Sequence, residues 1–324
     1  MKRLILPFLF LLLCGPGFAQ VRHDVPEGTF VPDPDRTLCY AQRDTCDLLL
    51  DFFAAAPDCG PCADSPRKPL IIHVFGGGFL MGKRNYPDDR IWYRQLADAG
   101  YNVAAIDYRL ALKGRTIKNK LSLPPMLEEA LQVAVEDLFS ATNYLIDNAE
   151  ALGIDPGRII VSGSSAGAMT ALQAEWEICN GKAPAKVLPG WFNYAGIMAF
   201  AGAVFSSDGP INFPQKPCPI LLCYGTEDHL VPFGSINLLG NHFAGSAALA
   251  KKLKAVGANF QIYRYTGSGH EISVSMHRNV PEELRFLEEN VIKGVYRPLD
   301  ATLTDAGMED PGWGKASTQD LYAN

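Results

Sequence analysis

Several features that mark particular classes of protein are missing from this sequence. The formal net charge is only −6, and no basic stripe with interleaved aromatic residues is present, which argues against a nucleic-acid partner. No internal repeat is found, which excludes repeat architectures. The single C-x-x-C motif has neither a second pair nor nearby histidines, so it is weak evidence for zinc. We therefore expect no metal site.

Long apolar runs are also scarce, and the one near the N-terminus, Leu4–Leu13, is too short to span a bilayer. Lys2 and Arg3 precede this run, and Gly17–Ala19 supplies small residues for cleavage. A charged start, an apolar run and a small-residue cleavage site predict a signal peptide over residues 1–19. We expect export to the periplasm or the cell exterior, without stable membrane insertion.

Cys14 offers an alternative, because a cysteine after an apolar run can mark a lipoprotein. The residue before it, Leu13, is bulky where a lipidation signal prefers a small residue. Removal of the whole segment is therefore favoured over lipidation.

What the chain does contain is enough apolar sequence for one large core. Of its 324 residues 48% are hydrophobic, and strand-like and helical runs alternate. This alternation predicts an α/β fold, with a mostly parallel sheet, an antiparallel start and helices on both faces. Residues 201–218 are too few for a large cap domain. Strand-like runs lie near 36–42, 46–53, 69–75, 101–107, 158–162, 197–201, 219–224 and 260–265, and helical runs near 88–99, 125–149, 166–178, 243–256 and 281–292.

The division of the chain follows from these runs. A single catalytic domain is expected over residues 20–297, since no linker interrupts the alternating pattern. From Gly294 onward the sequence lacks apolar periodicity. We therefore expect a loosely ordered tail over residues 298–324.

The most informative stretch is Gly163–Gly167, which reads Gly-Ser-Ser-Ala-Gly and fits the G-x-S-x-G nucleophile elbow. The apolar run Arg158–Val161 precedes it and the helix-forming run Ala166–Trp176 follows it. In a chain with 30 glycines the bare pattern arises by chance, but strand, sharp turn and helix form the context that the motif needs. We expect Ser165 to be a nucleophile at a helix N-terminus.

An activated serine needs a base, and four histidines follow Ser165 in the chain. His270 lies in a glycine-rich loop directly after the strand-like run Phe260–Tyr265, at a strand end where sheets present catalytic loops. His229 directly follows the candidate acid and does not fit the required order, and His277 lies further along near a helix. His270 is therefore the predicted base.

The base needs an acid to orient it, and Asp228 follows the buried run Pro219–Tyr224. A carboxylate on the turn after a strand, one strand and one helix before the histidine, fits the order serine, acid, histidine. Glu227 is the rival, and an exposed turn acid is the alternative explanation for either residue. Asp228 is the predicted acid.

Three glycines follow the strand-like run Leu70–Phe75 directly. They free the backbone to point N–H groups at a carbonyl oxygen that becomes negative, although a flexible turn is the alternative. Gly77, Gly78 and the N–H of Ala166 are the predicted oxyanion donors. His73 lies in mid-strand, where a packed core histidine is the favoured interpretation.

Together these motifs resemble the α/β-hydrolases of the carboxylesterase and hormone-sensitive-lipase-like group. The resemblance spans residues 36–292 and implies the α/β-hydrolase fold, with Ser165, Asp228 and His270 as the triad. Phe75 stands where that group usually has a histidine that steadies the glycine loop, which puts the order of the loop in doubt. The motifs are Phe75–Phe79, Asp107–Arg109, Asp155–Pro156, Gly163–Gly167, Gly225–Asp228 and Gly269–His270.

The cysteines point to an oxidising compartment. Cleavage after residue 19 leaves seven of the eight cysteines, an odd number, so at least one is a free thiol or pairs between chains. Cys59 and Cys62 enclose Gly-Pro, as in thioredoxin-type redox proteins, but two prolines follow and oppose the helix that would lower a thiol pKa. A small structural disulfide is favoured there. Cys39 and Cys46 flank a turn and form a second candidate bridge.

The sequence thus predicts a serine hydrolase of carboxylic esters that works through an acyl-enzyme intermediate and needs no cofactor. A site without a large cap suits small-molecule esters as well as bulky or glycan-linked ones. An exopeptidase or amidase is the alternative, because the same triad permits it. A redox protein using Cys59 and Cys62 is the alternative from another class, and a complete triad argues against a catalytically silent binding protein.

Overall fold

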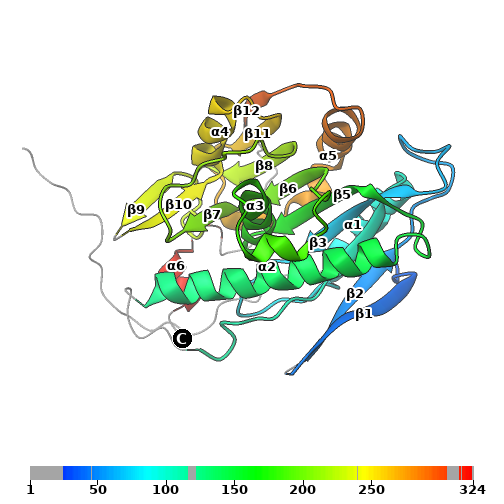
Figure 1. The fold of residues 1–324 in the computed structure, drawn as a ribbon, viewed down its shortest axis with the longest axis horizontal. Helices are drawn as coiled ribbons and strands as arrows, with labels where there is room; N and C mark the ends of the chain where they lie inside the picture. The colour runs from blue at the N-terminus through cyan, green and yellow to red at the C-terminus, as the bar shows by residue number, and fades with distance from the viewer. Residues whose placement is uncertain are drawn as a thin grey trace, which may run out of the picture.

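A nine-stranded sheet forms the centre of the protein (Figure 1). The computed structural model describes residues 25–44, 46–115, 122–238, 240–304, 314 and 316–322; the predicted signal peptide lies outside them. In spatial order the strands are β1 (Arg36–Arg43), β2 (Cys46–Phe53), β4 (Asn102–Ile106), β3 (Lys68–Val74), β5 (Ile154–Ser164), β6 (Gly196–Phe200), β8 (Ile220–Gly225), β11 (Phe260–Tyr265) and β12 (Leu299–Leu303).

Strand direction follows the predicted pattern. The β1–β2 and β2–β4 pairs are antiparallel, and every other neighbouring pair of this sheet is parallel. The predicted mostly parallel sheet with an antiparallel start is confirmed. All eight strand-like runs of the sequence fall on its strands.

The central strands are apolar on both faces because helices cover both. In β3, Leu70, Ile72 and Val74 pack into one core cluster, while Ile71 packs into the other. Successive side chains of a strand point to opposite faces, so a strand covered on both sides reads as a continuous apolar run.

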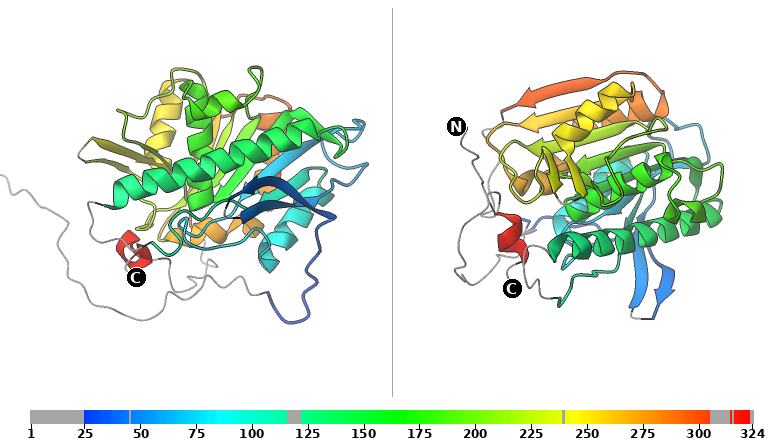
Figure 2. Two further views of the ribbon diagram at one scale, coloured as in Figure 1. Left: turned by 60° about the horizontal axis from the view of Figure 1, so that its bottom comes forward. Right: turned by 60° about the vertical axis from the view of Figure 1, so that its left-hand side comes forward.

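Helices of the two faces contribute to separate clusters. Figures 1 and 2 show the long helix α2 lying across one face of the sheet. The first face carries α2 (Leu123–Asp147), α3 (Ala166–Cys179) and α4 (Ser246–Ala255); the second carries α1 (Pro87–Asp98), α5 (Val280–Arg285) and the π-helix η4 (Phe286–Ile292).

A second, three-stranded antiparallel sheet was not predicted. Its order is β7 (Ala203–Ser206), β10 (Asn241–Gly245) and β9 (Ser235–Leu238). The predicted helix near 243–256 begins only at Ser246. The residues before it pair as strand β10 with β7, which lies far earlier in the sequence. Since these strands follow β6 and β8, the small sheet lies near the carboxyl ends of the parallel strands.

The loosely ordered tail predicted for residues 298–324 is wrong for the part that is described. β12 extends the main sheet parallel to β11, and a short helix, α6 (Thr318–Tyr322), packs on the body of the protein. The alternating exposure of β12 fits an edge strand with one face toward the core. In the described ranges, no helix combines the length and apolarity needed to cross a membrane.

Candidate active site

Ser165 occupies a sharp turn between β5 and α3. Its φ of 51° and ψ of −115° lie in a region that a residue with a side chain rarely adopts. Its N–H donates to the Phe200 carbonyl at 2.8 Å, and its own carbonyl accepts from the Met169 N–H at 2.9 Å. The neighbouring strand β6 and the helix α3 therefore hold the strained turn in place.

The two glycines of the motif are required by close packing. A Cβ on Gly163 would lie 2.3 Å from the carbonyl oxygen of Gly167, and a Cβ on Gly167 would lie 1.9 Å from that of Val74. Neither distance is physically possible without a shift of the backbone. The glycines thus let α3 approach β5 and β3, as their sequence context predicts.

The three residues predicted to act together lie in one hydrogen-bond chain. The Ser165 Oγ is 2.8 Å from His270 Nε2, and His270 Nδ1 is 2.8 Å from Asp228 Oδ2. Ser165 is partly accessible, whereas His270 and Asp228 are buried. This is the geometry in which a histidine can take a proton from a serine while a carboxylate orients the ring.

Asp228 and its rival Glu227 differ clearly in position. Asp228 Oδ1 accepts hydrogen bonds from the N–H groups of Leu230 and Val231, both at 2.9 Å, so the carboxylate is fixed facing His270. Glu227 is exposed. Of these two carboxylates, Asp228 is therefore the one placed against the imidazole.

His270 begins a short 3₁₀ helix, η2 (His270–Val274), where the sequence suggested a flexible loop. The backbone N–H of Gly269 donates to Glu271 Oε1 at 2.7 Å. The Ser164 hydroxyl donates to the Ser273 carbonyl at 2.6 Å. This bond ties the residue before Ser165 to the helix that carries His270, and the motif gave no signal for it.

The glycine loop after β3 adjoins Ser165. A Cβ on Gly76 would lie 3.2 Å from the Ser165 Cβ. Gly77 and Gly78 have φ values of 119° and 62°, which only glycine adopts freely. Phe79 also has a φ of 62°, in spite of its side chain. In the part of the chain that the structure describes, no hydrogen-bond acceptor pairs with the N–H groups of Gly77, Gly78 or Ala166. These donors are available to an anionic oxygen.

His73 is a core histidine, as predicted. It is buried, its Nδ1 lies 3.3 Å from the Ser162 hydroxyl, and its ring packs against Trp92 and Tyr93. Burial lowers the pKa of His73 to about 3, so the ring is neutral at physiological pH.

The predicted disulfides are not found: the described cysteines form no bridge. In the β1–β2 hairpin, Cys46 lies opposite Arg43 and Cys39 lies opposite Leu49. Cys39 and Cys46 are therefore separated along the hairpin by about 10 Å or more, which is beyond the reach of a disulfide.

The C-x-x-C motif is likewise unbridged. Cys59 is exposed, while the buried Cys62 sulfur accepts a hydrogen bond from Arg158 Nη1 at 3.0 Å. The turn after Cys62 is not a helix, which confirms the argument against a thioredoxin-type site. No group of side chains in the described ranges is arranged to hold a metal ion.

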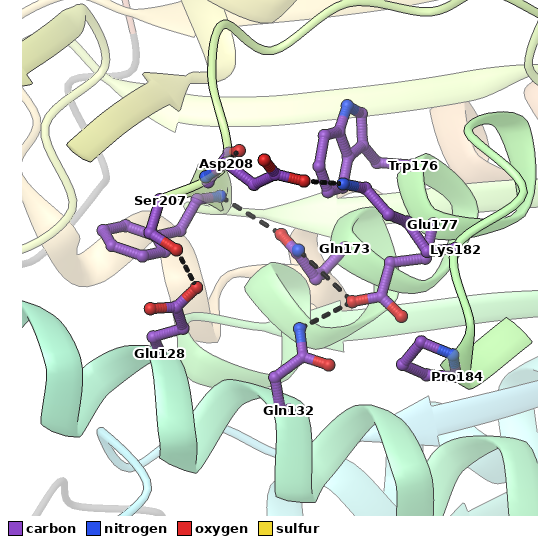
Figure 3. A pocket seen from close by; sticks show the side chains of 11 residues that line it. Glu128, Gln132, Gln173, Trp176, Glu177, Lys182, Pro184, Ser207 and Asp208 are labelled. Carbon is purple, nitrogen blue, oxygen red and sulfur yellow. Dashed lines mark hydrogen bonds and ion pairs between the residues drawn. The ribbon is translucent and has the colours of Figure 1, made fainter. Parts of the chain in front are cut away.

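A polar pocket between α2 and α3 is separate from this site (Figure 3). None of its lining residues belongs to the Ser165 chain or to the glycine loop. Its polar groups mostly bind one another: Ser207 with Glu128, Lys182 with Asp208, and Gln132 and Gln173 with Glu177. The pocket holds no activated nucleophile.

Comparison with known families decides the identity of the chain. The phospholipase/carboxylesterase family model matches residues 123–288, just over half of the sequence. The chain belongs to the phospholipase/carboxylesterase family. The BD-FAE family model matches residues 60–178 of this carboxylesterase-family chain.

Curated relatives of this carboxylesterase-family protein are esterases. Esterase LipI from Mycobacterium tuberculosis is 34% identical over 107 residues, which cover 33% of this chain and 28% of that protein. The isoprenylcysteine alpha-carbonyl methylesterase ICME from Arabidopsis thaliana is 24% identical over 310 residues, covering 83% and 63% respectively. The chain thus spans less than two thirds of the length of either relative.

Solved structures support the α/β-hydrolase fold. The apo form of Thermogutta terrifontis esterase 2 has a TM-score of 0.58 at 19% identity, covering 85% of this chain and 100% of that one. The same esterase phosphorylated by paraoxon has a TM-score of 0.57 at 18% identity, covering 82% and 96%. At this identity the likeness concerns the fold alone.

Proposed function

We propose that the protein is a serine hydrolase that cleaves carboxylic esters through an acyl-enzyme intermediate. The observation that carries this proposal is the hydrogen-bond chain from the Ser165 hydroxyl through the His270 ring to Asp228. His270 Nε2 takes the serine proton as Oγ bonds to the ester carbonyl carbon. Asp228 holds the Nδ1–H and stabilises the resulting imidazolium.

The N–H groups of Gly77, Gly78 and Ala166 hold the negative oxygen of the tetrahedral intermediate. The bond between the carbonyl carbon and the alcohol oxygen then breaks, and His270 gives its proton to the leaving alcohol. Water attacks the acyl-enzyme and gives a proton to His270, which returns it to Ser165 as the acid departs. No cofactor takes part in these steps.

The proposed substrates are small-molecule esters, with bulky or glycan-linked esters also admitted. The supporting observation is that the insertions after β6 and β8 form a small sheet, and that within the described ranges no large cap domain covers the carboxyl ends of the strands. The polar pocket of Figure 3 has no part in this proposal.

A substrate panel tests the proposal. Acyl-nitrophenyl esters, acetylated and feruloylated glycans and aminoacyl amides are compared with the Ser165→Ala protein as background. We expect esters to be hydrolysed far above that background, without any added metal or cofactor. Absence of ester hydrolysis would overturn the proposal, and higher kcat/KM on amides would make the protein an amidase.

We also propose that the protein is exported after removal of residues 1–19. The support is the charged and apolar N-terminal sequence. N-terminal sequencing of the protein recovered outside the cytoplasm should begin at Gln20. An intact Met1 in the exported protein would contradict this.

A further inference from the structure

The end of the described chain contacts all three loops of the candidate site. We call Gly314 and residues 316–322, which include α6 (Figures 1 and 2), the C-terminal clamp. The Tyr322 hydroxyl donates to the Gly78 carbonyl at 3.1 Å, and the Thr318 hydroxyl donates to the Leu230 carbonyl at 3.1 Å. The His270 N–H donates to the Gly314 carbonyl at 2.9 Å.

Two glycines of the site leave room for these contacts. A Cβ on Gly78 would lie 2.7 Å from Leu321 Cδ2, and a Cβ on Gly269 would lie 1.8 Å from the Gly314 oxygen. The clamp is therefore in direct van der Waals contact with the backbone of the glycine loop and with the residue before His270.

The glycine loop depends on outside partners for its order. Gly77, Gly78 and Phe79 all have positive φ, so the loop forms no regular element that would fix it. The Gly77 carbonyl accepts from the N–H groups of Leu80 and Met81 within the turn. The Gly78 carbonyl instead accepts from Tyr322, which is remote in sequence.

The Phe75 side chain contributes no polar atom to the loop. Its ring packs on Tyr108 at 4.5 Å between centroids, and the Tyr108 hydroxyl donates to the Phe75 carbonyl at 3.1 Å. Tyr108 thus holds the carbonyl at the start of the loop, and Tyr322 holds the carbonyl of Gly78. Because peptide groups are planar, the Gly77 carbonyl, held within the turn, sets the direction of the Gly78 N–H. The Tyr322 hydrogen bond holds the next peptide plane, so both planes that meet at the Gly78 Cα are fixed.

We propose that Tyr322 is a positioning residue that holds the conformation of the Gly77–Gly78 loop, and with it the direction of the oxyanion-binding N–H groups, from a segment remote in sequence. This inference rests on the proposed ester hydrolysis. Burial raises the pKa of Tyr322, so its hydroxyl stays a proton donor throughout the neutral range.

The test compares Tyr322→Phe with Tyr296→Phe, a matched change at an exposed tyrosine far along the chain from the loop. Removal of a direct oxyanion donor costs roughly 10²- to 10³-fold in kcat, and a residue that acts through the backbone costs less. We expect Tyr322→Phe to lower kcat about tenfold, with KM and Tm close to the wild-type values. The affinity for an alkyl boronic acid, which forms a tetrahedral adduct on the serine, should fall by a similar factor.

Four outcomes are distinguished. A kcat equal to that of Tyr296→Phe, or a rise in KM that accounts for the loss, would overturn the role of Tyr322. A wild-type protein without ester hydrolysis would overturn the proposed function itself, and this inference with it. A tenfold loss confined to kcat and to boronic acid affinity supports the proposal.

Discussion

At the residue scale, Ser165 shows how the local sequence and the fold agree on one strained position. Its positive φ costs about 1–3 kcal/mol, and the hydrogen bonds to β6 and α3 hold it. The strain keeps the side chain at the start of α3, where the free N–H groups of the helix favour negative charge. The residue with the strained backbone is therefore also the candidate nucleophile.

The acid can be tested with two neighbouring residues. Asp228→Asn should lower kcat by about 10⁴-fold, because an amide cannot hold the histidine in the tautomer that accepts the serine proton. Glu227→Gln should change kcat little, since Glu227 is exposed and the His270 ring pairs with Asp228. Steady-state kinetics on one ester measures both, and the reverse ranking would transfer the role to Glu227.

How much of the site could be predicted depends on how far apart in the sequence the contacting residues lie. The elbow and the order serine, acid, histidine led to Ser165, Asp228 and His270, which the structure brings together. Burial, which no local pattern reveals, separates Asp228 from Glu227. Contacts such as Ser164 with Ser273, or Tyr322 with Gly78, join distant segments, so no local sequence pattern predicts them.

At the element scale, the packing of α3 on the sheet depends on glycines, which have no side chain to keep the backbones apart. Gly167→Ala should destabilise the protein by about 1–3 kcal/mol or prevent folding, because its Cβ would overlap the Val74 carbonyl. It should also lower kcat through displacement of Ser165. Gly190→Ala is the matched control, since that site has open space around it and no positive φ.

Thermal unfolding and ester kinetics of both glycine variants check this prediction. Equal Tm values for Gly167→Ala and Gly190→Ala would show that α3 does not need the close approach. A loss in Gly190→Ala alone would contradict the assignment of the tight contact.

The main-sheet strands were predictable because burial on both faces leaves continuous apolar runs. β7, β9, β10 and β12 were not, because they are short. The partners of β7 and β12 lie far away in the sequence, and the β9–β10 hairpin contains no continuous apolar run. The β12 exposure alternates along only five residues, too few for a periodic signal. Local composition therefore identified the centre of the fold and missed its edge and its small sheet.

At the scale of the whole molecule, buried carboxyl groups couple stability to pH. Glu175 on α3 is buried, and desolvation raises its pKa to about 7 from 4.5. The folded protein therefore keeps a proton that the unfolded chain loses at lower pH. This contribution to stability is complete below about pH 4.5 and is lost as the pH rises through about 7.

Glu175→Gln should remove this dependence, because glutamine does not ionise. Between pH 5 and 8 the free energy of unfolding of the wild type should fall by roughly 2 kcal/mol relative to the variant. Denaturant unfolding at several pH values measures it, with the exposed Glu150→Gln as control. A constant difference between wild type and Glu175→Gln across this range would contradict the raised pKa.

Ser165 is the proposed nucleophile of a serine hydrolase. The direct test is to treat the wild-type, Ser165→Ala and Ser164→Ala proteins with a fluorophosphonate and to locate the adduct by peptide mass spectrometry. We expect one adduct on Ser165 in the wild type and in Ser164→Ala, none in Ser165→Ala, and a fall in kcat of about 10⁴- to 10⁶-fold in Ser165→Ala. An adduct on Ser164, or undiminished turnover by Ser165→Ala, would contradict the account.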